Sequence, residues 1–350
     1  MIHRLLALIL VAVIGSFSLQ ARTIEELQKL AEAGDAQAQF EYGDSLFEGV
    51  GINQNYTEAV KWYRKAAEQG NDNAQNTLGV CFTNGTGVTK DYADAVKWYR
   101  KAAEQGNVKA QFNLALCYED GDGVTKDNVE AVKWYHKAAE QGLADAQYNL
   151  GLCYYNGEGV IKDYTIAVKW FRKAAEQGDD NAQYSLGYCY YNGYGVTQDN
   201  VEAVKWYRKA AEQGNSYGQS NLAYCYDNGF GVTKDYTEAI KWYRKAAEQG
   251  NVFAQFNLGV YYYHGEGVCK DYPEAVKWYR KAAAQGDADA MNNLGVCYTK
   301  GNGVAISIPT AMYWYKKAGD AGNQTAVDNY NQLYDLGYRA KAPDSTSNQK

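Results

Sequence analysis

Apolar residues recur along this chain at the spacing of an α-helix, in stripes separated by short polar and glycine-containing stretches. In the segment Asn71–Gly106, a first stripe with the spacing of one helical face comprises Ala74, Leu78, Cys81 and Phe82. A second stripe in the same segment comprises Ala95, Trp98, Tyr99, Ala102 and Ala103. The pattern predicts two helices, one over about 73–83 and one that begins after Asp91 and ends before Gly106.

This two-helix pattern repeats along most of the chain. Successive tryptophans lie 36 residues apart, at Trp62, Trp98, Trp134, Trp170, Trp206, Trp242, Trp278 and Trp314. The string KWYRKAAEQG recurs nearly unchanged, and a Gly-x-Gly pair recurs from Gly49 and Gly51 to Gly301 and Gly303. A period of this size is typical of a solenoid, in which each supersecondary unit stacks on the next.

Small and polar residues mark where the helices begin and end. The first glycine of each Gly-x-Gly pair suits the left-handed conformation that ends a helix, and Asp91 is the predicted N-cap of the second helix. Other units read D-x-x-E at this cap, as in Asp127 and Glu130, which predicts a capping box. Gly79 lies inside the first helix although glycine lowers helix stability by roughly 1 kcal/mol. We therefore expect two helices to approach closely there.

The size of the aromatic residues predicts how the units assemble. Two helices alone cannot bury Trp98 and Tyr99, so neighbouring units must cover them. We predict an all-α fold, a right-handed α-α solenoid of helix-turn-helix repeats of 36 residues each, with a concave and a convex side. The expected organisation is a signal peptide at 1–21, an N-terminal half-repeat cap at 23–34, eight repeats at 35–322, a C-terminal capping helix at 323–339 and a disordered tail at 340–350.

The first residues have the layout of a secretory signal peptide. Met1–Arg4 is short and positively charged, Leu5–Phe17 is mostly apolar, and small residues up to Ala21 offer a cleavage point. The apolar run is short for a membrane span. We expect a secreted or periplasmic protein of the cell envelope, with no transmembrane segment in the mature chain. An uncleaved anchor is the alternative.

Charge and motifs exclude several classes of function. A formal net charge of -6 makes the chain a poor candidate for binding nucleic acid, which needs a basic surface. No S-x-x-K, H-E-x-x-H or G-x-S-x-G string occurs, and the Gly-x-Gly pairs follow predicted helices and lack a P-loop lysine. His136 and His264 lie in different units. We therefore expect no catalytic residues, no cofactor and no metal site.

Six of the 7 cysteines occupy one position of the repeat, namely Cys81, Cys117, Cys153, Cys189, Cys225 and Cys297. Equivalent positions on neighbouring stacked helices lie about 8–10 Å apart, whereas a disulfide needs Cα atoms within about 7 Å. We expect these six to be small buried apolar residues. Cys269 lies in a loop and is predicted to be a partly shielded thiol, with an intermolecular disulfide as the alternative.

The second helix carries basic residues on its outer side, as in Lys97, Arg100 and Lys101. Acidic residues at helical spacing, Asp94 and Glu104 among them, predict that these charges are neutralised locally. A basic stripe that binds anionic surfaces weakly is the alternative.

The combined pattern A-x-x-x-[LY]-G-x-x-[YF]…G-x-G-V…D-Y-x-x-A-x-x-W-Y-x-K-A-A-E-Q-G resembles the Sel-one-like repeat family, relatives of the tetratricopeptide repeats. The resemblance covers Asp35–Gly322 in every unit. It implies an α-solenoid that acts as a protein-binding scaffold or adaptor, with no catalytic residues to carry over. Exported bacterial members are often tied to envelope assembly, signalling or host interaction. One cysteine per repeat departs from the cysteine-rich branch of the family, which pairs two cysteines within a unit.

Residues of the first helices outside the apolar stripe are the candidate binding residues. If these helices line the concave side, they form a ladder of amides beside an apolar stripe, comprising Asn113, Asn149, Leu152, Tyr188, Asn221, Tyr224, Asn257 and Asn293. An asparagine offers two donors and an acceptor, which suits a peptide held in extended form. The alternative is that the amides bond only to adjacent repeats.

The most variable positions of the first helices are the predicted specificity determinants. They are Phe112, Tyr148, Tyr184, Ser220 and Phe256, with the pair Tyr217 and Phe253. Aromatic residues are enriched in binding hot spots, although at helical spacing they also serve as core.

We predict a non-enzymatic, exported scaffold or adaptor that binds a protein or peptide on the concave face. The first alternative function is that of a cell-envelope hydrolase or β-lactam-binding enzyme of the cysteine-rich branch, and family association alone suggests it. A surface glycan binder stays open because tyrosine and asparagine also suit sugars. The sequence identifies neither the partner nor the oligomeric state.

Overall fold

The structure, a computed structural model, describes residues 23–342. These residues form helices joined by short turns and include no strand. The predicted signal peptide at 1–21 and residues 343–350 of the predicted tail lie outside the described residues. The chain divides into two compact units, Met1–Lys126 and Asp127–Lys350.

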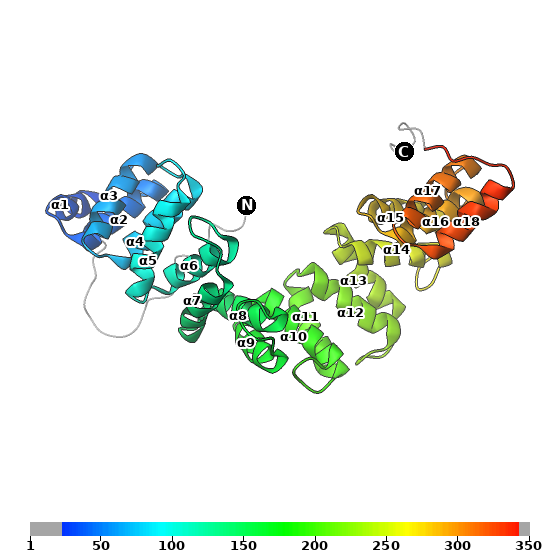
Figure 1. The fold of residues 1–350 in the computed structure, drawn as a ribbon, viewed down its shortest axis with the longest axis horizontal. Helices are drawn as coiled ribbons and strands as arrows, with labels where there is room; N and C mark the ends of the chain where they lie inside the picture. The colour runs from blue at the N-terminus through cyan, green and yellow to red at the C-terminus, as the bar shows by residue number, and fades with distance from the viewer. Residues whose placement is uncertain (1–22, 343–350) are drawn as a thin grey trace. The chain divides into compact units, whose positions relative to one another are not determined.

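Consecutive helices pack against each other within unit 1 (Figure 1). Its described helices are α1 (Ile24–Glu32), α2 (Ala36–Glu48), α3 (Tyr56–Glu68), α4 (Asp72–Asn84), α5 (Tyr92–Glu104) and α6 (Val108–Asp120).

Unit 2 is built in the same way from the remaining helices. They are α7 (Asn128–Glu140), α8 (Ala144–Asn156), α9 (Tyr164–Glu176), α10 (Asp180–Asn192), α11 (Asn200–Glu212), α12 (Ser216–Asn228), α13 (Tyr236–Glu248), α14 (Val252–His264), α15 (Tyr272–Ala284), α16 (Ala288–Lys300), α17 (Ile308–Asp320) and α18 (Gln324–Asp335). We call the even-numbered helices A helices and the odd-numbered helices B helices. In unit 2, A helices also touch one another, α10 with α12 and α16 with α18. The tandem helix pairs confirm the predicted α-solenoid.

The A helices begin and end as the sequence predicts. At the start of α4, Oδ1 of Asn71 accepts a hydrogen bond from the backbone N–H of Ala74, 2.8 Å away. At its end, Gly85 adopts a left-handed conformation with φ 73° and donates its N–H to the carbonyl of Cys81. The second glycine of the pair, Gly87, is needed for packing as well as for its φ of 72°. A Cβ at Gly87 would collide with the backbone carbonyl of Tyr56 in the preceding repeat.

Most B helices, from α5 to α15, are capped by aspartate, but the predicted capping box is wrong. Asp127 accepts hydrogen bonds from the N–H groups of Val129 and Glu130, as an N-cap should. The Glu130 carboxylate turns the other way and binds Nζ of Lys133, 2.7 Å away. In a capping box this carboxylate would accept a hydrogen bond from the backbone N–H of the N-cap residue. Here it pairs with Lys133, one turn further along the helix, instead. Among the described helices, α1 has the reciprocal arrangement, between Thr23 and Glu26.

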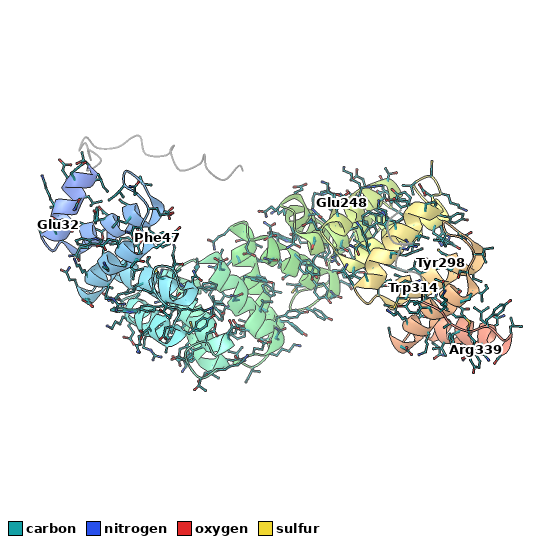
Figure 2. The ribbon with its side chains drawn as sticks, turned by 90° about the horizontal axis from the view of Figure 1, so that it is seen from above. Glu32, Phe47, Glu248, Tyr298, Trp314 and Arg339 are labelled. Atoms are coloured by element: carbon teal, nitrogen blue, oxygen red, sulfur yellow. The ribbon has the colours of Figure 1, made fainter. Side chains whose placement is uncertain are left out.

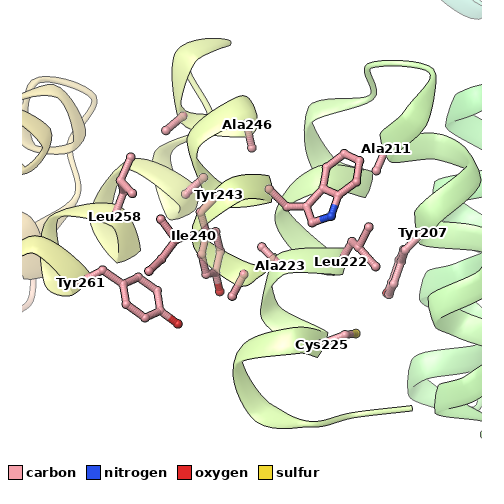
Figure 3. Packing of buried hydrophobic residues seen from close by; sticks show 14 of the residues in the cluster. Tyr207, Ala211, Leu222, Ala223, Cys225, Ile240, Tyr243, Ala246, Leu258 and Tyr261 are labelled. Atoms are coloured by element: carbon pink, nitrogen blue, oxygen red, sulfur yellow. The ribbon is translucent and has the colours of Figure 1, made fainter. Parts of the chain in front are cut away.

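The core of each repeat combines both of its helices with the next repeat (Figure 3). In unit 2, Tyr207 of α11, Leu222 of α12, Tyr243 of α13 and Leu258 of α14 belong to one buried cluster. Fully burying one such side chain contributes about 1.5–3 kcal/mol. Because the successive helices from α11 to α15 supply the cluster, no single hairpin could bury these residues alone.

Most tryptophans are buried between helices, as expected. Those that are buried are Trp62, Trp134, Trp206, Trp242 and Trp278. Trp98, Trp170 and Trp314 are half-buried instead. Nζ of Lys101 lies 4.2 Å from the centroid of the Trp98 ring, within the range of a cation–π contact.

The predicted close approach at Gly79 is confirmed. A Cβ at this position would lie 2.5 Å from Cε1 of Tyr99 on α5. The glycine therefore allows the A helix to lie directly on the tyrosine ring of its own repeat. Arg339, labelled in Figure 2, follows the last helix, α18. Its guanidinium lies over the ring of Tyr334, 4.2 Å from the centroid.

Candidate functional site

The predicted binding residues lie on A helices, and each is half-buried. Asn113 lies on α6 in unit 1. The others belong to unit 2, with Asn149 and Leu152 on α8, Tyr188 on α10, Asn221 and Tyr224 on α12, Asn257 on α14 and Asn293 on α16. We call these seven residues of unit 2, together with Tyr148, Tyr155 and Tyr184, the A-helix surface.

Several amides of the candidate ladder already have partners within the protein. Nδ2 of Asn113 donates a hydrogen bond to Oδ1 of Asn76 in the preceding repeat, 3.0 Å away. Asn221 and Asn257 donate instead to carbonyl oxygens one turn earlier in their own helices, at 2.9 Å and 2.8 Å. Each of these two bonds leaves one N–H and the amide oxygen for another partner. Asn113 thus links two repeats, whereas Asn221 and Asn257 are held in fixed orientations.

A socket lies on the A-helix surface between α8 and α10. Its volume is about 240 Å³, and its lining comprises Tyr148, Leu152, Tyr155, Asn156, Phe171, Tyr184, Ser185 and Tyr188. Phe171 of α9 contacts two of the tyrosines, with ring centroids 5.9 Å from Tyr148 and 6.2 Å from Tyr155. The structure therefore brings the predicted residues Leu152 and Tyr188 together with two predicted specificity residues, Tyr148 and Tyr184.

Three phenols of this socket, those of Tyr148, Tyr155 and Tyr184, are neutral at physiological pH. Burial raises the pKa of Tyr184 to about 12, with further contributions from neighbouring tyrosines. Burial likewise raises the pKa of Tyr148 and of Tyr155. Since no acidic or basic residue lines the socket, it presents an uncharged aromatic surface with a few hydroxyl and amide groups.

Two further sockets occur at the same register later in unit 2, one smaller and one slightly larger than the socket between α8 and α10. Between α14 and α16, a space of about 60 Å³ is lined by Tyr263, His264, Tyr279, Asn293 and Val296. Between α16 and α18, a space of about 270 Å³ is lined by Val296, Thr299, Lys300, Tyr315, Asn329, Gln332 and Leu333. In each case an aromatic residue of the intervening B helix contributes to the lining, as Phe171 does between α8 and α10.

A further pocket lies toward the N-terminal ends of α12 and α14. Its volume is about 580 Å³, and its lining comprises Ser216, Tyr217, Ser220, Asn221, Gln249, Gly250, Asn251, Val252, Phe253 and Gln285. We call it the α12–α14 pocket. It contains three of the predicted specificity residues, Tyr217, Ser220 and Phe253.

The charges of the B helices are neutralised locally, but not with all the predicted partners. Lys97 forms an ion pair with Asp94, at 2.7 Å. The expected pairing of Arg100 with Glu104 is wrong, because Nη2 of Arg100 donates to the hydroxyl of Tyr118 on the next A helix, 2.7 Å away. The arginine side chain thus bridges two repeats. The same contact recurs in unit 2, between Arg172 and Tyr190, Arg208 and Tyr226, Arg244 and Tyr262, and Arg280 and Tyr298.

A buried glutamine ladder was not predicted from the sequence. In each A helix with this residue, Nε2 of the glutamine donates to an alanine carbonyl of the preceding B helix, as Gln219 does to Ala211 at 3.1 Å. Its oxygen accepts from the glutamine that ends the next B helix, as Gln219 does from Gln249 at 2.8 Å. The sequence does contain a signal, a glutamine 30 residues before the glutamine of each Glu-Gln-Gly string. The ladder satisfies buried polar groups and fixes the register between repeats.

The cysteines of the repeated position are buried, whereas Cys269 is exposed. All 7 cysteines are free, and the six at the repeated position are buried, which confirms the prediction. Burial raises the pKa of the Cys189 thiol to about 12, so it is protonated and unreactive at neutral pH. Cys269 is free and exposed rather than partly shielded. Among residues 23–342 no three histidine, cysteine or acidic side chains cluster in a way that could hold a metal ion.

Comparison with known proteins identifies the repeat. The Sel1 repeat family matches eight consecutive segments, 36–71, 72–107, 108–143, 144–179, 180–215, 216–251, 252–287 and 288–323. No curated protein matches the chain.

Within the part of the chain that the structure describes, no helix has the length and apolar character needed to cross a bilayer.

Two solved structures resemble the chain along most of its length. One is a protective antigen present in uropathogenic Escherichia coli strains that displays an SLR fold, with 43% sequence identity and a TM-score of 0.84, covering 90% of this chain and 68% of that one. The other is a Sel1 repeat protein from Oxalobacter formigenes, with 36% identity and a TM-score of 0.68, covering 89% of this chain and 90% of that one. The helix pairs, the glycine turns and these matches together show that the chain belongs to the Sel1 repeat family.

Proposed function

We propose that this protein is an exported scaffold or adaptor without catalytic activity, which binds a protein or peptide partner through the A-helix surface. Export is supported by the signal-peptide layout of residues 1–21. The resemblance to a protective antigen of uropathogenic Escherichia coli is compatible with a location at the cell envelope.

The observation that carries the proposal is the aromatic, uncharged character of the A-helix surface. The socket between α8 and α10 presents five aromatic side chains and no acid or base. The exposed faces of the B helices differ, because they carry lysines paired with acidic residues three positions earlier, such as Lys205 with Glu202. Rigid tyrosines lose little conformational entropy on binding and are typical of interface hot spots.

The amides and the sockets suit different parts of an extended peptide. The oxygen and one N–H remain on Asn221 and on Asn257, and can bond to a peptide backbone. The socket near Tyr188 is large enough for an apolar side chain of such a peptide. Peptide recognition by fixed polar groups and side-chain pockets follows this division of roles.

The proposal is tested by crosslinking the protein in its native cell envelope and identifying the captured partner by mass spectrometry. The purified partner is then titrated against Tyr188→Ala and against the double variant Asn221→Ala, Asn257→Ala. We expect at least a tenfold loss of affinity for each, with melting temperatures close to that of the original protein.

Lys169→Ala is the matched control, because Lys169 lies on the exposed face of α9. It should bind the partner normally. If all variants bind equally well, the partner does not use the A-helix surface. If the asparagine variant melts earlier but keeps its affinity, these amides serve the fold alone.

A further inference from the structure

We propose that the α12–α14 pocket binds a neutral saccharide, with a sugar ring held against Tyr217 and Phe253. The pocket shares Asn221 with the A-helix surface but is otherwise made of different residues. The proposal therefore stands apart from the protein partner proposed above.

The pocket lies where α12 carries a small residue, Ser220, at a position that is aromatic in most repeats. Most other A helices carry a ring at the position of Ser220, namely Phe40, Phe112, Tyr148, Tyr184 and Phe256. Where the ring is present it packs on the B-helix aromatic of its own repeat, as Tyr184 does on Tyr207 with centroids 6.1 Å apart. Ser220 is 3% exposed and cannot fill this space, and it lines the pocket instead.

Phe253 of the following repeat occupies part of the vacated space. Its ring lies 6.1 Å from Tyr243 and 6.0 Å from Tyr224, so it makes the contact with the B helix that a ring at Ser220 would make. These contacts fix the orientation of Phe253. The side chain nevertheless stays 47% exposed, and its free face borders the pocket.

Tyr217 forms a second aromatic wall. Its ring lies 5.6 Å from that of Tyr184, which supports it from one side, and the side chain is 60% exposed. Other A helices carry a polar residue in this register, namely Asn73, Lys109, Asp145, Asn181 and Asp289. Tyr217 and Phe253 are thus two exposed rings at a position that is otherwise polar, and both line the same pocket.

Asn251 gives the pocket free hydrogen-bond donors. Elsewhere the capping asparagine of an A helix donates Nδ2 to the preceding A helix, as Asn215 does to Asp180 and Asn181 at 3.2 Å and 3.1 Å. One repeat later, the positions of Asp180 and Asn181 are occupied by Ser216 and Tyr217. Asn251 therefore faces neither of the two side-chain acceptors that Asn215 has. Oδ1 of Asn251 still caps its helix, whereas Nδ2 has no hydrogen bond within the described residues. Two N–H groups are therefore available to a ligand.

The lining defines the chemical class of the ligand. The polar residues of the pocket carry only hydroxyl and amide groups, and no acid or base is among them. A phosphate or carboxylate would find no cation to pair with, and an amine would find no anion. A wholly apolar ligand would leave the amides without partners. A neutral sugar ring fits both parts, because its C–H face packs on aromatic rings and its hydroxyls donate and accept hydrogen bonds.

The test uses the full chain and an array of neutral oligosaccharides, followed by calorimetric titration of the best ligand, with cellobiose and N,N′-diacetylchitobiose as reference probes. Tyr217→Asn restores the residue found at Asn181, removes one aromatic wall and returns an acceptor to Asn251. Ser220→Tyr refills the pocket with the residue found at Tyr184. We expect each substitution to weaken binding at least tenfold.

Asp145→Asn is the control, because Asp145 has the register of Tyr217 on α8 and lies outside the pocket. It should bind as the original chain does. The proposal is overturned if no neutral oligosaccharide binds, or if charged glycans bind in preference. Equal binding by Tyr217→Asn would also overturn it. That variant keeps the test decisive even if Ser220→Tyr does not fold.

Discussion

Nε2 of Gln249 donates a hydrogen bond to Oε1 of Gln219, 2.8 Å away, and so joins the end of α13 to the buried start of α12. Gln219 in turn donates to the carbonyl of Ala211 on α11. One buried side chain therefore satisfies groups on the helices before and after it. The same arrangement recurs at Gln75, Gln147, Gln183 and Gln255.

We expect Gln219→Ala to destabilise unit 2. The substitution removes two hydrogen bonds, the one that Gln219 donates to the carbonyl of Ala211 and the one that it accepts from Gln249. Each such bond contributes about 0.5–1.5 kcal/mol to stability. Chemical denaturation measures the loss. Gln28→Ala on α1 is the control, because Gln28 bonds to an exposed glutamate and should change stability little. Equal stability of the two variants would show that the ladder contributes nothing.

Gly151→Ala should also destabilise the protein, although alanine is the better helix former. A Cβ at Gly151 would lie 2.6 Å from Cδ1 of Phe171. The helix propensity gained is about 1 kcal/mol, whereas overpacking a core costs about 1–3 kcal/mol. Thermal denaturation of Gly151→Ala, alone and combined with Phe171→Leu, measures the effect. The smaller side chain should restore part of the stability, and a rise in melting temperature for Gly151→Ala alone would contradict the packing argument.

The native protein should have a single reactive thiol at neutral pH. Cys269 is exposed, whereas the other six cysteines are buried. Burial raises the pKa of Cys225 and of Cys297 to about 12, which keeps these thiols protonated. Titration with a chromogenic disulfide should therefore release about one equivalent from the native chain. Unfolding in guanidinium should expose all 7, and Cys269→Ser should remove the native signal.

Stability should fall as the pH rises above about 9. An unfolded thiol loses its proton near its ordinary pKa of 9.0, whereas burial raises the pKa of Cys189 to about 12 in the folded chain. The unfolded state therefore binds fewer protons between these values, so its free energy drops relative to the folded state. The thiol's contribution is complete below pH 9 and is lost progressively toward pH 12. Burial raises the pKa of Tyr207 as well, which acts in the same direction.

Denaturation midpoints measured from pH 7 to pH 11 check this expectation. Cys189→Ala should flatten the alkaline slope, since one titrating group contributes at most about 1.4 kcal/mol per pH unit. A midpoint that stays constant up to pH 11 would contradict the prediction.

The sequence predicted those features of the fold that are determined by residues within a single repeat. Helix spacing, the glycine turn at Gly85 and the close approach at Gly79 all follow from local pattern and from residue size. The buried cysteines followed as well, because the distance between stacked helices excludes a disulfide. Each of these features depends on residues near one another in one repeat, or on the fixed distance between repeats.

The contacts between repeats could not be predicted in the same way. Sequence spacing favoured Glu104 as the partner of Arg100, but the arginine reaches Tyr118 on the next helix. The sequence marked Ser220 as a variable position without showing that its small side chain opens a pocket. Both outcomes depend on how neighbouring helices are placed, and the spacing within one helix does not contain that information.

The glutamine ladder gives most pairs of neighbouring repeats the same junction. Each link joins two glutamines 30 residues apart with the same atoms, as in Gln105 with Gln75 and in Gln285 with Gln255. Deleting or duplicating one complete repeat would therefore bring together surfaces that already match. Proteins built in this way can change length by whole modules during evolution while every new junction keeps its polar groups paired.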